Sequence, residues 1–272
     1  MTFSIVGRST EGSEPSWGVA VASKFLAVGN VVPAAVAGLG ALATQAEANV
    51  AWKGVGLSLL DEGATAQVAL ERMVEEDDKR EHRQLGIVDS DGNGATWTGP
   101  ACFDWAGGYA GQDVAIQGNI LAGPEVVEQM RTAWTQAAGE PLARRLLAAL
   151  AAGDAAGGDR RGRQSAALLV VREGAGYGGL DDVAVDLRVD DHAEPIVELA
   201  RLLELNDLYL TASTDEEKVE VTDALREELE AFARSQGQPD FRGWVGTENY
   251  EMRVADDVSW IDERILAVVR GS

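Results

Sequence analysis

The sequence is poor in cysteine, histidine and positive charge. One cysteine, Cys102, excludes an internal disulfide framework and a zinc finger built on cysteine. Two histidines, His82 and His192, exclude a metal site with several histidine ligands. The 272 residues hold 45 Asp and Glu against 23 Lys and Arg, a formal charge of -22. Such a chain repels a phosphate backbone and an anionic lipid surface, so we expect neither nucleic acid nor membrane as a partner.

Long hydrophobic runs are also missing. The longest weakly polar stretch, residues 31–43, is interrupted by Pro33, Gly38 and Gly40. It is shorter than the roughly 20 residues that a membrane-spanning helix needs. The first residues lack the basic segment and following apolar segment of a secretory signal peptide. We therefore expect a soluble, cytoplasmic protein.

The composition changes near residue 195. Residues 1–195 hold 27 of the 31 glycines, and short apolar runs alternate there with glycine. Residues 196–272 carry 18 acidic and 8 basic side chains, with apolar residues at helical spacing. These patterns predict an α/β (α+β) body with largely antiparallel strands, followed by a small acidic helical module. We expect strands at 3–6, 17–23, 40–44, 85–88, 95–98, 114–117 and 166–171, and helices at 55–74, 124–152 (broken at 139–141), 196–210, 215–235 and 261–270.

Thr2 is the first candidate for chemistry. Removal of Met1 would leave Thr2 with a free α-amine beside its own hydroxyl. An α-amine has an ordinary pKa of about 8, so it can act as a general base near neutral pH. A threonine activated by its own terminal amine is an established kind of nucleophile. Many chains begin with Met-Thr for no catalytic reason, so the position by itself leaves the role of Thr2 open.

The glycine-rich segment 157–166 contains an acid, an amide, a hydroxyl and several arginines. Arginine suits the recognition of carboxylate or phosphate, and backbone donors in such a loop can stabilise an oxyanion. An exposed basic turn that pairs with nearby acids would have the same composition. The polar side chains of the segment are those of Asp159, Arg160, Arg161, Arg163, Gln164 and Ser165.

Polar residues also stand at the ends of other expected strands. The amides of Gln45, Gln117 and Asn119 could position a carbonyl group or donate to an oxyanion. Lys24 follows a strand and could lower the pKa of a nearby terminal amine. His82 could bind a carboxylate or transfer a proton, although a polar group at a strand edge is the simpler interpretation.

Familiar ligand-binding motifs are incomplete or missing. Residues 89–94 resemble the start of a calcium-binding EF-hand loop, but Pro100 stands where that loop needs glutamate, so a hairpin turn is favoured. The patterns of a Walker loop and of a serine-hydrolase elbow do not occur. Residues 174–179 (GAGYGG) have the glycine spacing of a dinucleotide-binding turn, but they follow the charged residues Arg172 and Glu173, so a flexible turn is favoured. We expect no metal and no organic cofactor.

Several segments, taken in order, resemble a bacterial family called domain of unknown function 1028. They are residues 1–6 (MTFSIV), 17–25 (WGVAVASKF), 40–46 (GALATQA), 80–84 (REHRQ), 117–124 (QGNILAGP), 157–166 (GGDRRGRQSA) and 186–192 (DLRVDDH). The resemblance covers nearly all of residues 1–195. Residues 241–253 (FRGWVGTENYEMR) resemble a peptidoglycan-binding-like module that often follows this family's domain.

The resemblance implies a fold and an activity. The family is classed as similar to the N-terminal nucleophile hydrolases, whose fold is a four-layer αββα sandwich. It implies that Thr2 is nucleophile and base in the hydrolysis of a small amide or imide. Lys24, Gln45, Asn119 and Asp159 would then surround the reacting atoms. His82, Arg163, Gln164 and Ser165 would bind the substrate.

Two other interpretations stay open. One is a catalytically silent member of the fold that binds a small anionic ligand or a cell-wall fragment through the arginine-containing segment and the tail. Retention of Met1 would favour it. The other is an oligomeric scaffold whose acidic tail serves assembly, and we expect a homo-oligomer.

Overall fold

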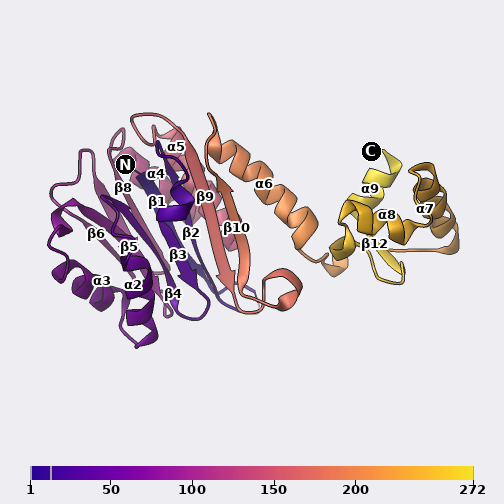
Figure 1. Cartoon of the computed structure of the whole chain (residues 1–272), viewed down its shortest axis with the longest axis horizontal. Helices are drawn as coiled ribbons and strands as arrows, with labels where there is room; N and C mark the ends of the chain where they lie inside the picture. Colours follow the sequence, from indigo (N-terminus) through magenta and orange to yellow (C-terminus); the bar gives the residue numbers. More distant parts are fainter. Residues whose placement is uncertain (1, 13, 272) are drawn as a thin grey trace. The chain divides into compact units, whose positions relative to one another are not determined.

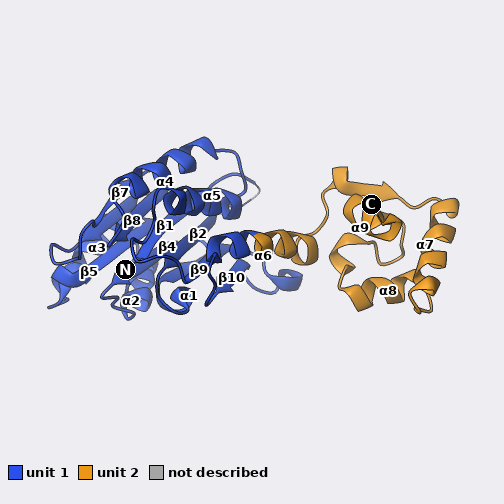
Figure 2. Cartoon of the chain, turned by 90° about the horizontal axis from the view of Figure 1, so that it is seen from above, with its two compact units in different colours: residues 1–200 blue, residues 201–272 orange. Residues whose placement is uncertain are grey.

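A computed structural model describes residues 2–12 and 14–271 of the chain (Figure 1). Met1, whose removal the sequence analysis considers, lies outside the described residues. The chain divides into two compact units, residues 1–200 and 201–272, coloured separately in Figure 2. The division falls inside helix α6 (Pro195–Leu210), whereas the change in composition predicts a boundary at the start of that helix.

Unit 1 is a mixed α and β structure with two antiparallel sheets. The six-stranded sheet has the order β10-β9-β2-β1-β8-β7, and the four-stranded sheet has the order β3-β4-β5-β6. The first comprises β1 (Thr2–Ser9), β2 (Ser16–Ser23), β7 (Gly107–Gly111), β8 (Val114–Asn119), β9 (Ser165–Arg172) and β10 (Val183–Val189). The second comprises β3 (Pro33–Val36), β4 (Gly40–Ala46), β5 (Arg83–Asp89) and β6 (Gly94–Thr98).

Helices pack on both sheets (Figure 1). Helices α4 (Glu125–Gln136) and α5 (Leu142–Ala155) contact the six-stranded sheet, while α2 (Trp52–Asp61) and α3 (Ala66–Glu75) contact the four-stranded sheet. The short helix α1 (Val28–Val31) lies against β2 and β9. Gly7 on β1 allows close packing, because a Cβ atom there would lie 2.7 Å from the Trp134 ring of α4.

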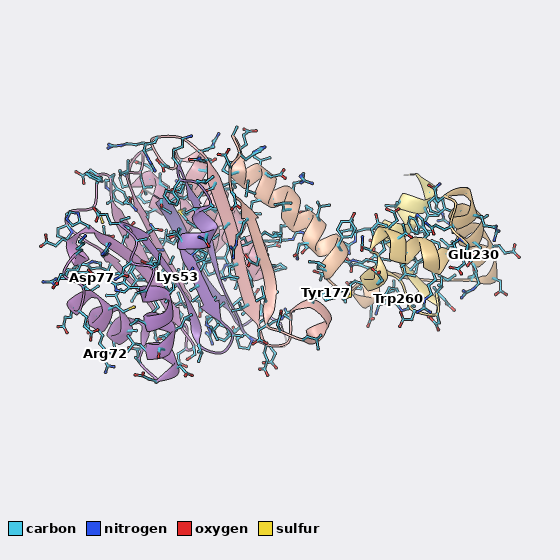
Figure 3. The ribbon with its side chains drawn as sticks, in the orientation of Figure 1. Lys53, Arg72, Asp77, Tyr177, Glu230 and Trp260 are labelled. Atoms are coloured by element: carbon cyan, nitrogen blue, oxygen red, sulfur yellow. The ribbon has the colours of Figure 1, made fainter. Side chains whose placement is uncertain are left out.

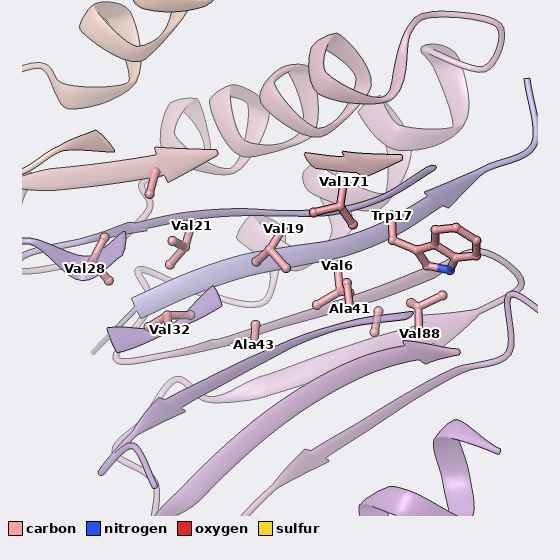
Figure 4. Packing of buried hydrophobic residues seen from close by; sticks show 12 residues of the cluster. Val6, Trp17, Val19, Val21, Val28, Val32, Ala41, Ala43, Val88 and Val171 are labelled. Carbon is pink, nitrogen blue, oxygen red and sulfur yellow. The ribbon is translucent and has the colours of Figure 1, made fainter. Parts of the chain in front are cut away.

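The two sheets pack face to face through a cluster of small and branched apolar side chains (Figure 4). Residues of the six-stranded sheet meet residues of the four-stranded sheet there. Successive side chains of a strand point to opposite faces of its sheet, so only alternate residues enter this layer. The labelled members include Val6, Val19 and Val21 from one sheet and Ala41, Ala43 and Val88 from the other.

Two expected helices are wrong in extent. The predicted helix over residues 55–74 is two helices, α2 and α3, because Gly63 has a positive φ of 86° and Thr65 caps α3 by accepting from the Val68 amide. Lys53 and Arg72, labelled in Figure 3, belong to these two helices. The predicted helix over 215–235 begins only at α7 (Asp223–Ser235), because residues 218–220 form a strand.

Several elements are absent from the sequence-based expectation. Examples are strands β3, β7 and β10, and helix α8 (Phe241–Glu248). A loop precedes strand β10. Tyr177 in this loop is 76% exposed and is labelled in Figure 3. The hairpin favoured for residues 89–94 is confirmed, because it connects β5 to β6.

Unit 2 has its own apolar core. Helices α7, α8 and α9 (Glu263–Arg270) pack with a two-stranded sheet of β11 (Lys218–Glu220) and β12 (Trp260–Asp262). Lys218 lies over the ring of Trp260, which Figure 3 labels together with Glu230 of α7. In both units, no helix of the described residues is long and apolar enough to cross a membrane.

Candidate functional site

The layer between the two sheets of unit 1 changes from apolar to polar along its strands. On β1, Val6 belongs to the apolar cluster, and Ser4 and Thr2 follow at the alternate positions that face the same side. The strands β4, β5 and β8 show the same change. Their inward series run from Ala43 to Gln45, from Val88 to Gln84, and from Ala115 to Gln117 and Asn119.

Ser4, Gln45, Gln84, Gln117 and Asn119 form a buried group that we call the amide cluster. Gln45 Nε2 and Asn119 Nδ2 both donate to Gln84 Oε1, at 2.8 and 2.9 Å. Gln84 Nε2 in turn donates to Thr98 Oγ1 at 2.9 Å and to the Gly118 carbonyl at 2.7 Å. Ser4 Oγ donates to Gln45 Oε1 at 2.7 Å and accepts from Gln117 Nε2 at 2.6 Å. The cluster therefore joins four strands of both sheets without any charge.

Thr2 lies at the end of β1 against this cluster. Its carbonyl oxygen accepts from Gln45 Nε2 at 3.3 Å and from Asn119 Nδ2 at 3.4 Å. Its hydroxyl lies 3.1 Å from the hydroxyl of Ser23, the last residue of β2. Thr2 is only 4% exposed, so the residue is almost completely shielded from solvent.

Gln117 crosses the layer above Gly86 of β5. A Cβ atom at Gly86 would lie 1.9 Å from Gln117 Oε1, so only glycine leaves room for this amide. Gln117 Oε1 is buried and has no hydrogen-bond partner among the described residues. Gly86 therefore provides the space between the sheets that the Gln117 side chain occupies.

Backbone strain adjoins the cluster on two strands. Ala46 follows Gln45 with φ 67°, and Ile120 follows Asn119 with φ 50°. A β-branched residue such as Ile120 rarely adopts this conformation, which costs about 1–3 kcal/mol and is typical of functional sites.

A second group of polar residues lies at the end of β2. Asp159 is buried and accepts from the Lys24 amide at 2.9 Å and from Arg161 Nη2 at 2.8 Å. Lys24 Nζ donates to the Arg163 carbonyl at 3.2 Å, and Arg163 Nε pairs with Asp154 at 2.9 Å. This pair raises the pKa of the Arg163 guanidinium, mainly through the hydrogen bond with Asp154. Two arginines of the segment are therefore already neutralised by aspartates.

This second group adjoins Thr2 through Ser23. Ser23, Asp159, Arg163 and Ser165 line one small cavity of about 10 Å³, enough for a single water molecule. Ser165 Oγ accepts from the Val28 amide at 3.1 Å and donates to the Phe25 carbonyl. Its contacts thus hold the loop that follows β2.

The remaining predicted residues lie elsewhere. Gln164 donates to Asp191 at the surface, away from these contacts. His82 is half-exposed, with Nδ1 3.8 Å from Glu47 Oε1, and it lines a cavity together with Asn119. The structure thus brings Thr2, Gln45 and Asn119 together and places Lys24, Asp159, Arg163 and Ser165 in the neighbouring group.

Comparison with known proteins places the chain in a family. The model of the family of unknown function DUF1028 matches residues 2–199. The chain belongs to this family. A DUF1028 protein from Silicibacter pomeroyi has a crystal structure with a TM-score of 0.68 and 30% identity, covering 79% of this chain and 90% of that one.

A more distant structural match is a mutant of Anbu from Hyphomicrobium sp. strain MC1. It has 12% identity and a TM-score of 0.33, covering 75% of this chain and 94% of that one. No curated protein matches the chain significantly. The DUF1028 match includes the whole amide cluster and the arginine-containing segment, so both belong to the family domain.

Part of this candidate site was not predicted from the sequence. Ser4 and Ser23 were not singled out, and Gln84 was quoted only as part of a family segment. A signal for Gln84 exists, because Gln84, Gly86 and Val88 alternate on one face of a strand that is apolar further on. Within the described residues, no group of three or more His, Cys, Asp or Glu side chains is arranged to hold a metal ion.

Proposed function

We propose that the chain is an amide-hydrolysing enzyme in which Thr2 is an N-terminal nucleophile. The observation that carries the proposal is the placement of the Thr2 hydroxyl, buried at the end of β1 with its carbonyl bound by two side-chain amides. A hydroxyl at an arbitrary chain start has no need of such fixation. Strain at Ala46 and Ile120 beside the same residues adds support.

The proposal includes a four-layer αββα arrangement of unit 1. Support comes from the two sheets that pack face to face and from the helices that contact each of them. In such an arrangement the end of β1, with Thr2, lies between the sheets.

The reaction would start with removal of Met1, which frees the Thr2 amine. That amine takes the proton of the Thr2 hydroxyl while Oγ1 attacks the amide carbonyl carbon. The C–N bond then breaks, and the amine returns the proton to the leaving nitrogen. Water hydrolyses the resulting ester and releases the acid. Ser23 Oγ, 3.1 Å from Thr2 Oγ1, would orient the hydroxyl.

Gln45 and Asn119 would act as positioning residues. Their N–H groups donate to the Thr2 carbonyl and to Gln84, so these donors hold the nucleophile. Asp159 would fix the loop after β2 by binding the Lys24 amide. Arg163 and Ser165 would shape the rim beside Ser23.

The first test is the intact mass of protein purified without an N-terminal tag. The proposal requires a mass short by one methionine. A chain that retains Met1 has no free Thr2 amine, and this result would overturn the mechanism in favour of a binding protein.

The second test uses a panel of small primary amides and cyclic imides. Release of ammonia or of carboxylic acid is measured for the wild type, Thr2→Ala, Thr2→Ser and the exposed control Thr10→Ala. Loss of one nucleophile of a catalytic unit costs on the order of a thousandfold or more in rate, and we expect this for Thr2→Ala. Thr2→Ser should keep part of the activity and Thr10→Ala all of it. Equal turnover by Thr2→Ala and the wild type would overturn the assignment.

A further inference from the structure

A cavity of about 90 Å³ opens beside the amide cluster. It is lined by Ala46, Glu47, His82, Cys102, Phe103 and Asn119. Asn119 connects it to the nucleophile, because Asn119 is the β-sheet partner of Thr2 and also binds the Thr2 carbonyl. A cavity of this volume suits a group of a few non-hydrogen atoms.

Three backbone donors of the cavity wall, the amides of Glu47, Ala101 and Cys102, are already used. The amide of Glu47 donates to the His82 carbonyl at 3.1 Å, that of Ala101 to Glu81 at 2.8 Å, and that of Cys102 to Gly99 at 3.0 Å. The Cys102 thiol donates to the Arg83 carbonyl at 3.4 Å. These groups therefore have no hydrogen left for a ligand.

The side-chain amide of Asn119 is used in the same way. An amide nitrogen carries two hydrogens. Those of Asn119 are directed to the Thr2 carbonyl and to Gln84 Oε1. Its Oδ1 atom remains, and this atom can only accept. Glu47 contributes a carboxylate, which also only accepts when ionised. The His82 ring can accept or donate.

We propose that this cavity binds a nitrogen donor group, an unsubstituted amide NH₂ or an ammonium, of the substrate that Thr2 cleaves. The identification of that molecule as substrate rests on the proposed function, whereas binding of the group does not. The side-chain atoms that remain at the cavity, Asn119 Oδ1 and the Glu47 carboxylate, are acceptors, so an N–H donor satisfies them. A carboxylate would meet the Glu47 carboxylate and Asn119 Oδ1, neither of which can donate a hydrogen to it, so we expect it to bind more weakly than an N–H donor.

The cavity provides its own reporter. Cys102 is the one cysteine of the 272-residue sequence, so a thiol reagent labels the chain at a single position. Methyl methanethiosulfonate is small and lacks N–H donors. The rate of labelling is followed by mass spectrometry at mildly alkaline pH, because burial raises the pKa of the Cys102 thiol.

Four probes with similar skeletons separate the possibilities. They are propionamide, ethylammonium, propionate and N,N-dimethylpropionamide, which has no N–H donor. A bound probe slows labelling by mass action, about tenfold at about ten times its dissociation constant. Propionamide and ethylammonium should protect Cys102. Propionate and N,N-dimethylpropionamide should not.

A carboxylate variant tests the role of Glu47. Glu47→Gln should abolish protection by ethylammonium and retain protection by propionamide. Glu75→Gln, a change at an exposed carboxylate of α3, should leave both unchanged. Protection that is equal for all four probes, or protection by propionate, would overturn the proposal.

The experiment is repeated with Thr2→Ala and with thermal unfolding as a second readout. The Thr2→Ala chain should bind the two donor probes as the wild type does, even if neither is turned over. Donor probes should also raise the midpoint of unfolding more than the other two, whether or not the thiol reacts. Absence of both effects would overturn the cavity assignment, while failure of Thr2 as nucleophile would appear only in the turnover assay.

Discussion

The two units of the chain each bury a polar cluster, but they do so with different chemistry. In unit 1 the amide cluster is neutral, and its members bind one another and the Thr2 carbonyl. In unit 2 the cluster is ionic. Arg253 is 1% exposed, and its Nη1 atom lies 2.9 Å from Asp262, which also accepts from Ser213 at 2.6 Å.

The difference follows from what surrounds each cluster. Unit 1 has large apolar clusters between its sheets and between a sheet and its helices. The stability of its fold therefore does not depend on the amide cluster alone. Unit 2 has only about 70 residues, and a unit of this size rarely buries enough apolar surface to be stable by its core alone. There Arg253 also binds the Leu208 and Asp207 carbonyls, which ties the end of α6 to β12. These contacts make the ionic cluster part of the framework of unit 2, whereas the proposed function assigns the amide cluster to the site of unit 1.

The largest expected effect is in unit 2. Arg253→Met leaves the buried Asp262 carboxylate with one cationic neighbour fewer, and breaking a buried ion pair costs about 3–5 kcal/mol. Hydrogen exchange should show faster local opening in α7 to α9 and no change in unit 1. The control Arg270→Met removes the exposed pair with Glu228, which is screened by solvent, and should have little effect on stability. Equal effects of the two changes would contradict the comparison.

The next effect is in the amide cluster. Gln84→Leu removes the acceptor that Gln45 and Asn119 share, and each buried donor without a partner costs about 1–3 kcal/mol. In denaturant unfolding we expect unit 1 to lose about 3 kcal/mol of stability, and we expect activity to fall because the amides that bind the Thr2 carbonyl lose a partner. Gln112→Leu, a change at an exposed amide, should have little effect. If Gln84→Leu is as stable as the wild type, the cluster does not hold the site.

Gly86→Ala gives a smaller but more local effect. Its Cβ atom would lie 1.9 Å from Gln117 Oε1, so the buried amide must move. Overpacking of this kind costs about 1–3 kcal/mol. The control is Gly54→Ala in α2, where a Cβ atom meets nothing within 4 Å and alanine favours the helix by up to about 1 kcal/mol. Opposite signs of the two changes in thermal unfolding would confirm the crowding.

The sequence predicted much of unit 1 because its signals are local. Apolar runs between glycines marked the central strands, and amides at strand ends pointed to Gln45 and Asn119. The break between α2 and α3 was missed although Gly63 and Thr65 mark it, because the apolar spacing continues across it. Gln84 was missed because its role depends on partners from β4 and β8, which only the fold brings to it. Strand β10 was missed because it packs at a sheet edge, where polar residues such as Asp186 and Arg188 interrupt the apolar pattern.

The smallest expected effect is that of acid, which should lower the stability of unit 2 through its ionic cluster but not that of unit 1 through its amide cluster. Burial by itself would raise the pKa of Asp262, but hydrogen bonds from Arg264 and Ser213 and the charge of Arg264 outweigh it, so the pKa lies below its ordinary value. A carboxyl group with a lowered folded-state pKa stabilises fully above its unfolded pKa of about 3.9 and loses this contribution as the pH falls towards the folded-state pKa. Glutamine and asparagine do not titrate, so the amide cluster makes no such contribution.

The measurement is the loss of native indole NMR signals below about pH 4, where the Asp262 contribution falls. Trp244 reports on unit 2 and Trp17 on unit 1. In the wild type the Trp244 signal should weaken over this range. In Asp262→Asn it should be weaker at neutral pH but depend less on acid, because the titrating group is gone. An unchanged acid dependence of Trp244 in Asp262→Asn would show that other carboxylates, such as Glu217, govern the acid response of unit 2.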